Sequence, residues 1–406
     1  MTYTIQSTGK FGGSIQLPAS KSISNRVLLL NSLSQSIYFL KNVSTCDDTE
    51  VMKQALSQTQ PVVDIGAAGT AMRFLTAFFA ITPGERILTG TERMKKRPIG
   101  ILVEALRQMG AGIEYMEEEG YPPLKITGKD LDGGTVSLDG SVSSQYISAL
   151  MMIAPLTKKG IRIKIKGELI SKPYVRMTQS LMKDFGASLS WLLDTISIEK
   201  RSYSPAFDFT VENDWSAASY WYEMVALREK PTEIELLGLY KKSYQGDSAV
   251  AELFEKLGVS TEYTEKGVIL RKTKSTSTLF KYNFVKKPDL VQTFVVTCAL
   301  KNIPFHFEGL QSLKVKETDR IIALQTEMQK LGYSLVVSDK DIRWGGERCT
   351  AEENPIISTY EDHRMAMAFA PIALINDRIS IENPDVVSKS YPTYWKDLQK
   401  AGLIVD

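Results

Sequence analysis

The chain has 406 residues, of which 43% are hydrophobic and 24% are charged, and its formal net charge at pH 7 is +2. This length exceeds that of one ordinary domain and favours two domains of about 200 residues each. The near-neutral charge gives no electrostatic basis for binding nucleic acid or an acidic membrane, so any attraction for anions must be local.

The cysteines and histidines argue against a structural metal. Cys46, Cys298 and Cys349 lie far apart without a CxxC pair, and only two histidines are present. This usage is typical of reduced, mostly buried thiols in the cytoplasm, and no cluster has metal-ligand spacing. The first residues lack the apolar core of a signal peptide, and no apolar run nears the ~20 residues that span a bilayer. We therefore expect a soluble cytoplasmic protein that holds no metal.

The first informative motif along the chain is KSISNR at 21–26, which follows a proline-containing loop and opens into an apolar run. A loop becomes a helix at this point, so unpaired backbone N–H groups and the positive end of the helix dipole lie beside Lys21 and Arg26. Cations, hydroxyls and an amide at such a place can hold a phosphate or a carboxylate. The alternative is an N-capped helix with solvated charges.

Four further junctions of this kind follow in the first half of the chain. The Gly/Ala-rich loop at 66–73 lets a ligand approach the backbone closely, although many such loops are only tight turns. Four cations within 93–97 precede a helix, with a solvated charged loop as the alternative. The motifs SSQY at 143–146 and ISKPY at 170–174 place hydroxyl groups before a helix, which they can cap, or where they can grip a polar ligand.

The second half carries three more charged junctions. In the motif KVKETDR, Lys316 and Arg320 are four residues apart, which predicts that they share one helical face with Glu317 beside them. That carboxylate is either an ion-pair partner or a proton carrier aimed at a substrate. The motif EDHR at 361–364 sets a histidine beside an arginine at a helix start, and Lys389 precedes the last helix.

A repeated helix–glycine–strand pattern indicates how these junctions are organised. Five glycines about 70 to 76 residues apart each follow a helical stretch and precede a β-type run: Gly110, Gly186, Gly258, Gly332 and Gly402. Each is predicted to end a helix in the left-handed conformation. The period predicts duplicated α/β units, about six in all with one shortened near Lys10, and a crossing between two three-unit domains near 212–216.

Repeated units would explain why so many junctions carry lysine or arginine. The junctions converge only if the units present the same end to one cleft. A cleft lined by helix N-termini fits small ligands with several negative charges.

At this point the residues strongly resemble the 5-enolpyruvylshikimate-3-phosphate synthase family over nearly the whole chain. The motifs that carry the resemblance are, in order, LPASKSISNR, GAAGTAMR, RPIG, SSQY, ISKPY, KPD, KVKETDR, EDHRMAMAF and SKSYP. The resemblance implies an α/β fold of two domains, an inside-out α/β barrel in which each domain has three βαβαββ units around a pseudo-threefold axis. It places the shikimate 3-phosphate domain at 20–212, and the second domain, which completes the phosphoenolpyruvate site in the interdomain cleft, at 1–19 and 213–406.

The resemblance also implies the reaction. The family transfers enolpyruvate from phosphoenolpyruvate to the 5-hydroxyl of shikimate 3-phosphate, through a tetrahedral intermediate and without a metal or organic cofactor. A monomer is the expected state. The catalytic residues implied are Lys21, Asp289, Lys316, Glu317 and His363, with Asp214 as a further residue of the site.

The same resemblance implies two sets of binding residues. The shikimate 3-phosphate set is Lys21, Ser22, Arg26, Ser143, Ser144, Gln145, Ser171, Tyr174, Asp289, Ser312 and Lys316. The phosphoenolpyruvate set is Lys21, Gly69, Arg97, Gln145, Arg320, Arg364 and Lys389. Arginine forks and lysines suit a substrate that carries both a carboxylate and a phosphate. Glu317 is the expected proton carrier to the methylene carbon, and either Asp289 or Lys316 would take the hydroxyl proton.

The chain departs from the family pattern at several points. Ala19 and Ala67 stand where glycine and asparagine are usual, Phe74 replaces a proline, and Ser312 replaces an asparagine. The segment between Asp48 and Asp64 is short, as though a strand or two of one unit were trimmed. The altered glycine/alanine loop bears on glyphosate, the inhibitor that competes with phosphoenolpyruvate, and we expect Gly69 to preserve sensitivity.

Two other functions compete with this interpretation. The sister enzyme that acts on UDP-N-acetylglucosamine commonly has a cysteine in the loop before its Arg-Pro, and the loop at 91–96 has none. A non-catalytic anion-binding protein on the same scaffold would be expected to have lost one of Lys21, Asp289, Glu317 and Lys389, and all four are present.

Overall fold

The computed structural model describes residues 1–34, 37–141 and 143–406. They form two compact units, unit 1 with Met1–Ala19 and Glu212–Asp406, and unit 2 with Ser20–Val211. Unit 2 is inserted into unit 1 between strand β2 (Gly13–Gln16) and helix α8 (Trp215–Leu227).

Unit 2 has two four-stranded sheets and one two-stranded sheet within the described part of the chain. In both larger sheets two parallel strands are followed by antiparallel ones, in the orders β4–β5–β7–β6 and β8–β9–β11–β10. The strands are β4 (Val62–Asp64), β5 (Gly84–Thr89), β6 (Gly112–Tyr115), β7 (Leu124–Gly128), β8 (Gly134–Asp139), β9 (Ile161–Lys166), β10 (Leu189–Leu192) and β11 (Thr195–Ile198). Buried and exposed residues alternate along β9, so one face of its sheet packs against the interior.

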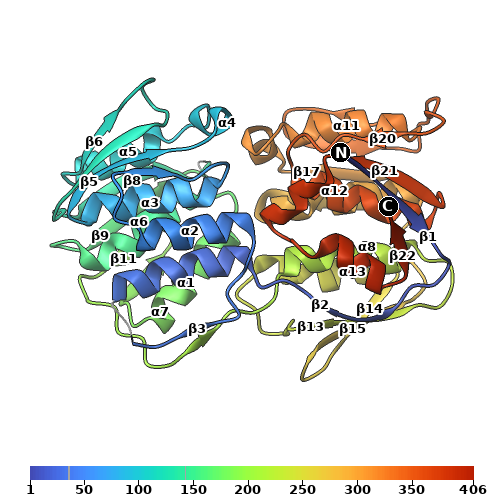
Figure 1. Cartoon of the computed structure of the whole chain (residues 1–406), viewed down its shortest axis with the longest axis horizontal. Helices are drawn as coiled ribbons and strands as arrows, with labels where there is room; N and C mark the ends of the chain where they lie inside the picture. The colour runs from blue at the N-terminus through green and yellow to red at the C-terminus, as the bar shows by residue number, and fades with distance from the viewer. Residues whose placement is uncertain (35–36, 142) are drawn as a thin grey trace. The chain divides into compact units, whose positions relative to one another are not determined.

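The helices of unit 2 connect these strands, and Figure 1 shows α1, α2 and α3 lying side by side. The helices are α1 (Lys21–Ser34), α2 (Asp47–Ser57), α3 (Gly69–Ile81), α4 (Glu92–Lys95), α5 (Gly100–Gln108), α6 (Ser144–Ile153) and α7 (Lys172–Asp184). Each complete repeat therefore reads βαβαββ, as in β8–α6–β9–α7–β10–β11. Nine of the ten residues of α6 are buried, all except Gln145, as expected for a helix enclosed on all sides.

One repeat of unit 2 is reduced. Strands β3 (Leu40–Lys41) and β12 (Phe209–Thr210) pair in parallel, like the first two strands of the other repeats. After α2 the chain enters β4 of the next repeat, and no third or fourth strand accompanies β3 in the described residues. This is the trimmed segment that the short sequence between Asp48 and Asp64 predicts.

Unit 1 has three four-stranded sheets among its described residues, all with the same pairing pattern. Their orders are β2–β13–β15–β14, β16–β17–β19–β18 and β20–β21–β1–β22, so the N-terminal strand completes the last sheet. The strands besides β2 are β1 (Thr2–Ser7), β13 (Glu233–Leu237), β14 (Val259–Tyr263), β15 (Gly267–Lys272), β16 (Phe280–Asn283), β17 (Phe305–Glu308), β18 (Val336–Val337), β19 (Asp341–Trp344), β20 (Ile356–Ile357), β21 (Arg378–Glu382) and β22 (Leu403–Val405).

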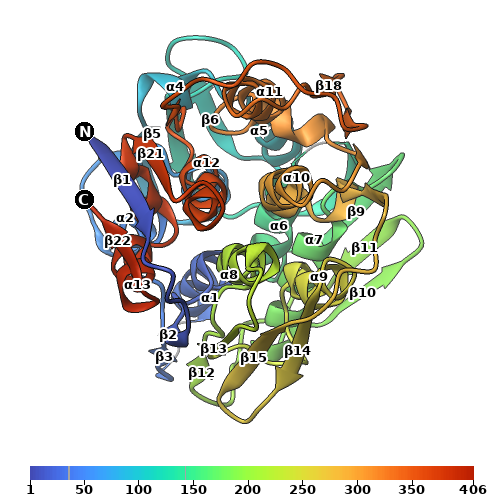
Figure 2. The same ribbon diagram turned by 90° about the vertical axis from the view of Figure 1, so that its right-hand side faces the viewer.

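Three helices occupy the middle of unit 1, and Figure 2 looks along α8, α10 and α12 with the sheets around them. The helices besides α8 are α9 (Val250–Glu255), α10 (Val291–Leu300), α11 (Arg320–Lys330), α12 (His363–Phe369) and α13 (Tyr394–Lys400). Short 3-10 helices are η1 (Ala154–Leu156) in unit 2 and, in unit 1, η2 (Gly246–Ala249), η3 (Phe284–Lys286), η4 (Pro288–Leu290), η5 (Gln311–Val315), η6 (Ala370–Leu374) and η7 (Pro384–Lys389).

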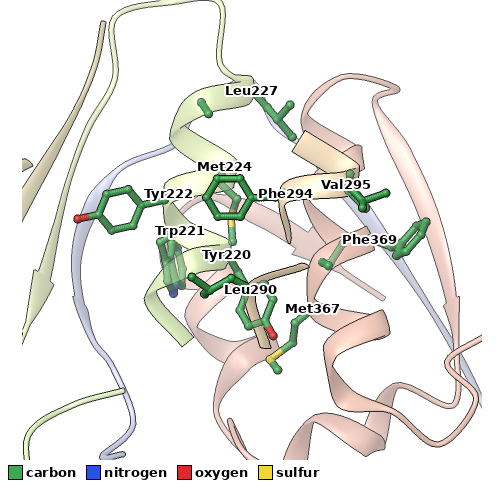
Figure 3. Packing of buried hydrophobic residues seen from close by; sticks show 14 of the residues in the cluster. Tyr220, Trp221, Tyr222, Met224, Leu227, Leu290, Phe294, Val295, Met367 and Phe369 are labelled. Atoms are coloured by element: carbon green, nitrogen blue, oxygen red, sulfur yellow. The ribbon is translucent and has the colours of Figure 1, made fainter. Parts of the chain in front are cut away.

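The core of unit 1 is built where these three helices meet. Tyr220 and Met224 of α8, Phe294 of α10 and Phe369 of α12 are at most 1% exposed and pack together (Figure 3). Every residue of α10 is buried, as expected for a helix that is apolar on all sides. A helix held in this way fixes the position of the residues at its N-terminus.

The five repeated glycines confirm the predicted helix ends. Their φ angles lie between 85° and 105°, a region that disfavours residues with a Cβ. In the part of the chain that the structure describes, no helix combines the length and the apolar character needed to cross a membrane.

Candidate functional site

Helix α1 places Arg26 in the interior of unit 2, with 2% of its surface exposed. Its Nε donates to Thr178 Oγ1 (2.7 Å), its Nη1 donates to the Ser22 carbonyl (2.8 Å), and its Cζ lies 5.2 Å from the ring centroid of Phe74. Burial lowers the pKa of Arg26 to about 10, which still leaves the guanidinium charged at neutral pH. Within the described chain no carboxylate pairs with this buried charge, so an incoming anion would balance it.

The N-terminus of α7 lies beside Arg26. Its N-cap residue Ser171 has a φ of 53°, and its hydroxyl makes no capping bond to the helix. The Tyr174 carbonyl accepts from Thr178 Oγ1 (3.1 Å) and from Arg26 Nη2 (3.5 Å). The predicted residues Ser171, Tyr174 and Arg26 are thus brought together, and the Ser171 hydroxyl does not cap the helix.

Helix α6 brings the SSQY motif to the same group. Ser143 caps the helix by accepting from the Gln145 N–H (3.3 Å), and the Gln145 side chain donates to Thr70 Oγ1 of α3 (3.0 Å). Ser144 is buried, and Arg26 Nη2 donates to Ser148 Oγ one turn further along (3.4 Å). Side-chain bonds therefore link α6 to both α1 and α3.

Gly69 opens α3 directly under the guanidinium of Arg97. A Cβ at Gly69 would lie 2.6 Å from Arg97 Nη1, so only glycine fits without moving the arginine. The Ala68 N-cap of α3 offers no side-chain cap, and the buried Arg97 Nε has no hydrogen-bond partner among the described residues. Arg73 holds the loop closed by donating to the carbonyls of Gly69 (3.2 Å) and Pro98 (3.1 Å).

Lys21 is the first residue of α1, and its Nζ lies 3.2 Å from Asp48 Oδ2 of α2. Both side chains are largely buried, at 15% and 7% exposure. Ser22 follows in the same turn and accepts from Arg26 through its carbonyl. The carboxylate of Asp48 belongs to this site, and sequence reasoning did not identify it.

In unit 1 the corresponding centre is Arg320, at 1% exposure. Its guanidinium donates to three carboxylates: Nε to Asp362 Oδ2 (2.6 Å), Nη1 to Asp289 Oδ1 (3.1 Å) and Nη2 to Glu317 Oε2 (3.1 Å). Burial opposes the charge, but Asp362, Glu317 and Asp289 together raise the pKa of Arg320 above its usual value. Asp362 also caps α12 through the Arg364 N–H (2.9 Å) and was likewise not identified from the sequence.

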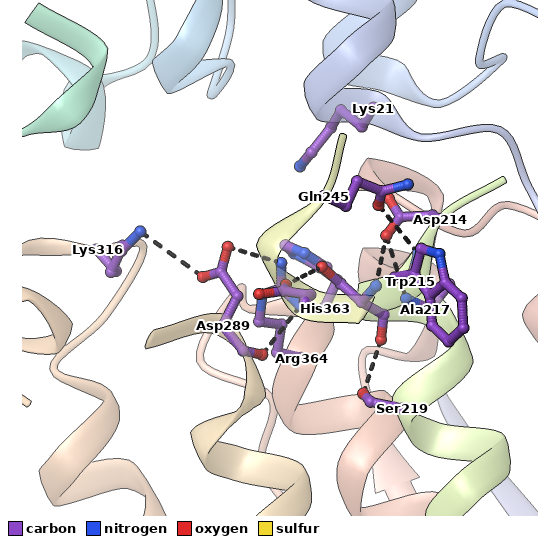
Figure 4. A network of polar contacts seen from close by, with 12 residues as sticks. Lys21, Asp214, Trp215, Ala217, Ser219, Gln245, Asp289, Lys316, His363 and Arg364 are labelled. Atoms are coloured by element: carbon purple, nitrogen blue, oxygen red, sulfur yellow. Dashed lines mark hydrogen bonds and ion pairs between the residues drawn. The ribbon is translucent and has the colours of Figure 1, made fainter. Parts of the chain in front are cut away.

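Asp289 is shared among several cations (Figure 4). Its Oδ2 lies 3.1 Å from Arg364 Nη2, its Oδ1 lies 3.7 Å from Lys316 Nζ, and its carbonyl accepts from Arg364 Nη1 (3.2 Å). Burial is the main cause that lowers the pKa of Lys316, partly offset by Asp289. The neutral amine, which can accept a proton, therefore forms at a lower pH than in an ordinary lysine.

The predicted helical face for Lys316 and Arg320 is wrong. Lys316 is the C-cap residue that follows η5 and has extended backbone (ψ −152°), and α11 begins only at Arg320 with Asp319 as its N-cap. The side chain of Asp319 accepts from the N–H groups of Ile321 (3.1 Å) and Ile322 (3.3 Å), which fixes the helix start there. Both cations nevertheless reach Asp289 from different elements.

Other predicted residues lie around this network. Lys389, the last residue of η7, places Nζ 3.4 Å from Glu317 Oε1, and His363 opens α12 with Nδ1 3.8 Å from Asp362 Oδ1. Asp214 caps α8 by accepting from the N–H groups of Ser216 (2.7 Å) and Ala217 (3.3 Å). Ser312 lies half-buried in η5.

The two groups differ in what they can do chemically. The unit 2 group offers buried or half-buried cations and hydroxyls, which suit a phosphate-bearing ligand. The unit 1 group interleaves cations with carboxylates, which suits binding an anion and moving protons beside it. In the described residues no set of three or more His, Cys, Asp and Glu side chains could hold a metal ion.

Comparison with known proteins identifies similar chains. The family model of EPSP synthase (3-phosphoshikimate 1-carboxyvinyltransferase) matches residues 5–61 and 53–398. A 3-phosphoshikimate 1-carboxyvinyltransferase of Bacteroides fragilis (strain YCH46) is 56% identical over 405 residues, covering 99% of this chain and 98% of its own. A protein of the same name from Vibrio atlanticus is 38% identical over 435 residues, covering 98% and 99%.

Solved structures show the same fold. EPSP synthase from Acinetobacter baumannii superposes with a TM-score of 0.78 at 20% identity, covering all of both chains. The enolpyruvyl transferase NikO from Streptomyces tendae gives a TM-score of 0.73 at 14% identity, covering 100% of this chain and 98% of its own. The predicted two-domain α/β fold class of enolpyruvyl transferases is confirmed.

Proposed function

The chain belongs to the EPSP synthase family, and we propose that it transfers the enolpyruvyl group of phosphoenolpyruvate to the 5-hydroxyl of shikimate 3-phosphate, releasing phosphate. This reaction is a step of the shikimate pathway toward aromatic amino acids. The observation on the molecule that carries the proposal is the network in which Asp289 and Glu317 share Arg320. It combines anion-binding cations with carboxylates that can carry protons.

We assign shikimate 3-phosphate mainly to unit 2. The buried charge of Arg26 and the uncapped hydroxyl of Ser171 support this assignment, because a phosphate is stabilised by cations and hydrogen-bond donors. The proposed residues of unit 2 are Lys21, Ser22, Arg26, Ser143, Ser144, Gln145, Ser171 and Tyr174. Those of unit 1 are Asp289, Ser312 and Lys316.

For phosphoenolpyruvate we assign Lys21, Gly69, Arg97 and Gln145 in unit 2 and Arg320, Arg364 and Lys389 in unit 1. The unpartnered Nε of Arg97 supports its role, since a buried donor without an acceptor is costly until an anion supplies one. Arginine forks recognise both the carboxylate and the phosphate of this substrate.

The chemistry needs two proton movements. The 5-oxygen forms a bond to carbon 2 of phosphoenolpyruvate while carbon 3 gains a proton, which gives a tetrahedral adduct. The bond from carbon 2 to the phosphate oxygen then breaks, and the methyl group returns a proton as the double bond re-forms. Glu317, held between Arg320 and Lys389, is the proposed proton carrier to and from carbon 3.

The proton of the 5-hydroxyl needs a different acceptor, and we propose Asp289 or Lys316. The lowered pKa of Lys316 supports the amine, while the position of Asp289 among three cations supports the carboxylate as the group that orders the site. His363 completes the proposed catalytic group, and Asp214 is a further residue of the proposed site. Lys21 also belongs to the catalytic group through its charge, which Asp48 holds in place.

The proposal is tested by phosphate release. Purified protein is mixed with phosphoenolpyruvate and shikimate 3-phosphate, with UDP-N-acetylglucosamine as the parallel acceptor. Release with shikimate 3-phosphate alone is the expected result. Release only with the UDP-sugar would overturn the acceptor assignment, and no release with either, together with binding of both ligands, would identify a non-catalytic anion-binding protein.

We further propose that the chain acts as a monomer in the cytoplasm. The reduced-thiol pattern of its three free cysteines supports this location. Sedimentation of the purified chain at several concentrations tests the monomer, since a mass above 45.3 kDa that grows with concentration would contradict it.

A further inference from the structure

The β10–β11 hairpin of unit 2 carries a tryptophan that lies against the first turns of α7. The Cζ atom of Arg176 is 3.9 Å from the ring centroid of Trp191, and Lys172 Nζ is 5.4 Å from it. The ring is oriented by its own Nε1, which donates to the Leu193 carbonyl (3.2 Å). Arg176 is oriented by Gln179, whose Oε1 accepts from its Nη1 (2.7 Å). Trp191 therefore holds two cations of one helix at once.

These two cations occupy an unfavourable place. Lys172 and Arg176 are four residues apart, so they lie on one face of α7, within its first turns, where the helix dipole disfavours positive charge. Neither forms an ion pair among the described residues. A carboxylate could stabilise them, but it would also add negative charge beside Ser171 and Tyr174. An aromatic face attracts cations without adding a negative charge beside them.

The turn that these contacts support is strained. Ser171 holds a left-handed φ of 53° without a glycine, and its hydroxyl makes no capping bond. The N–H of Tyr174 bonds to the Ser171 carbonyl (3.0 Å) and closes the turn. Such a conformation persists only where surrounding contacts fix it, and Trp191 supplies a contact on the face of α7 that carries Lys172.

We propose that Trp191 is a positioning residue for shikimate 3-phosphate. It holds the first turn of α7 in place and orients Lys172 and Arg176, so that the turn bearing Ser171 and Tyr174 presents a positive potential to the phosphate. This inference rests on the proposed function, because that function assigns Ser171 and Tyr174 to this substrate.

The test compares Trp191→Ala with two matched variants. Trp191→Phe keeps an aromatic face, and Leu192→Ala changes the neighbouring residue of the hairpin, which is 73% exposed. We expect Trp191→Ala to raise the KM for shikimate 3-phosphate about 3- to 10-fold. The kcat and the KM for phosphoenolpyruvate should stay within about twofold, Trp191→Phe should restore most of the loss, and Leu192→Ala should match the unaltered chain.

The alternatives give different results. An unchanged KM for shikimate 3-phosphate in Trp191→Ala overturns the inference. An equal rise of both KM values with a lower melting temperature reports a merely structural hairpin and also overturns it, unless Arg176→Met, which leaves the ring in place, raises only the KM for shikimate 3-phosphate. Failure of the proposed function is distinct, because the unaltered chain would then release no phosphate.

Discussion

The two units differ in how the N-termini of their site helices are capped. In unit 1 three helices at the charged network begin at an aspartate cap, Asp214 on α8, Asp319 on α11 and Asp362 on α12, whereas α10 has no side-chain cap. In unit 2, α6 is capped by a neutral serine, and α3 and α7 have no side-chain cap. A carboxylate cancels the positive end of a helix dipole, and a neutral cap leaves it. Unit 2 therefore keeps an uncancelled attraction for anions, whereas unit 1 is nearly charge-balanced before a ligand arrives.

Two arginines show the same difference. Arg26 in unit 2 is buried among hydroxyls and carbonyls, and burial lowers its pKa to about 10. Arg320 in unit 1 is equally buried, but its three carboxylates raise its pKa. The first is a charge that lacks a counterion, and the second organises carboxylates that can work on a substrate. Binding and proton transfer are thus prepared by different local chemistry on the same repeated scaffold.

The largest effect is expected from removing the proposed proton carrier of unit 1. Glu317→Gln keeps the size of the side chain between Arg320 and Lys389 but cannot carry a proton. We expect kcat to fall by roughly 10²–10⁴, with binding of shikimate 3-phosphate nearly unchanged. Single-turnover phosphate release and a separate binding titration measure the two quantities. Near-normal turnover would remove Glu317 from the mechanism.

The next effect removes the unbalanced charge of unit 2. Arg26→Ala deletes the guanidinium that joins α1, α6 and α7, and we expect the KM for shikimate 3-phosphate to rise on the order of 100-fold, as loss of a buried charge-assisted contact does. The KM for phosphoenolpyruvate should rise much less. Thr178→Val is the matched control, because it removes one partner of Arg26 but leaves the charge. Equal weakening of both substrates in Arg26→Ala would indicate loss of the fold instead of loss of a contact.

Much of this arrangement could be predicted from the sequence, because local chemistry fixed it. The glycines that end helices at positive φ, the helix starts at 21 and 144, and the trimmed repeat all have short-range signals. The order of the motifs then indicated the family. Residues that act through distant contacts, such as Asp48 beside Lys21, had no such signal.

The failures have two physical causes, one local and one tertiary. Lys316 and Arg320 matched a helical spacing, but the cap at Asp319 starts α11 later and leaves Lys316 in extended backbone. Asp362 was not identified from the sequence, because its role at Arg320 depends on how α11 and α12 pack. Spacing predicts neighbours within one element, but tertiary packing decides which elements share a charge.

A smaller effect is expected at Gly69, the first residue of α3, which has no side-chain cap. Gly69→Ala adds a Cβ that would lie 2.6 Å from Arg97 Nη1, so the guanidinium must move. We expect the KM for phosphoenolpyruvate to rise about 10-fold, with that for shikimate 3-phosphate unchanged. The unaltered chain should be inhibited by millimolar glyphosate and the variant less so. No inhibition of the unaltered chain would contradict this expectation.

A double-mutant cycle isolates the cause. Arg97→Lys replaces the fork that the added Cβ meets, so Gly69→Ala should cost less in that background than in the unaltered chain. Strictly additive effects would mean that the methyl group acts on the α3 backbone instead of on Arg97.

The smallest effect concerns a carboxyl of unit 1 that lacks the cations found at Asp289 and Glu317. Glu223 of α8 is fully buried and forms no ion pair within the described chain, and burial raises its pKa well above 4.5. The folded state then keeps a proton that the unfolded state releases. Stability from this group is therefore present below about pH 4.5 and is lost as the pH rises toward the raised folded pKa.

Glu223→Gln removes this dependence while keeping the shape of the side chain. We expect its melting temperature to exceed that of the unaltered chain by about 2–4 °C at pH 8.5, with a smaller difference at pH 5. Glu229→Gln, at an exposed position just after α8, should change neither. A gain of the same size at both pH values would mean that Glu223 is already ionised in the fold. In that case a buried carboxylate of unit 1 would be charged without a neighbouring cation. The cations beside Asp289 and Glu317 would then not be needed to explain why those two side chains are charged.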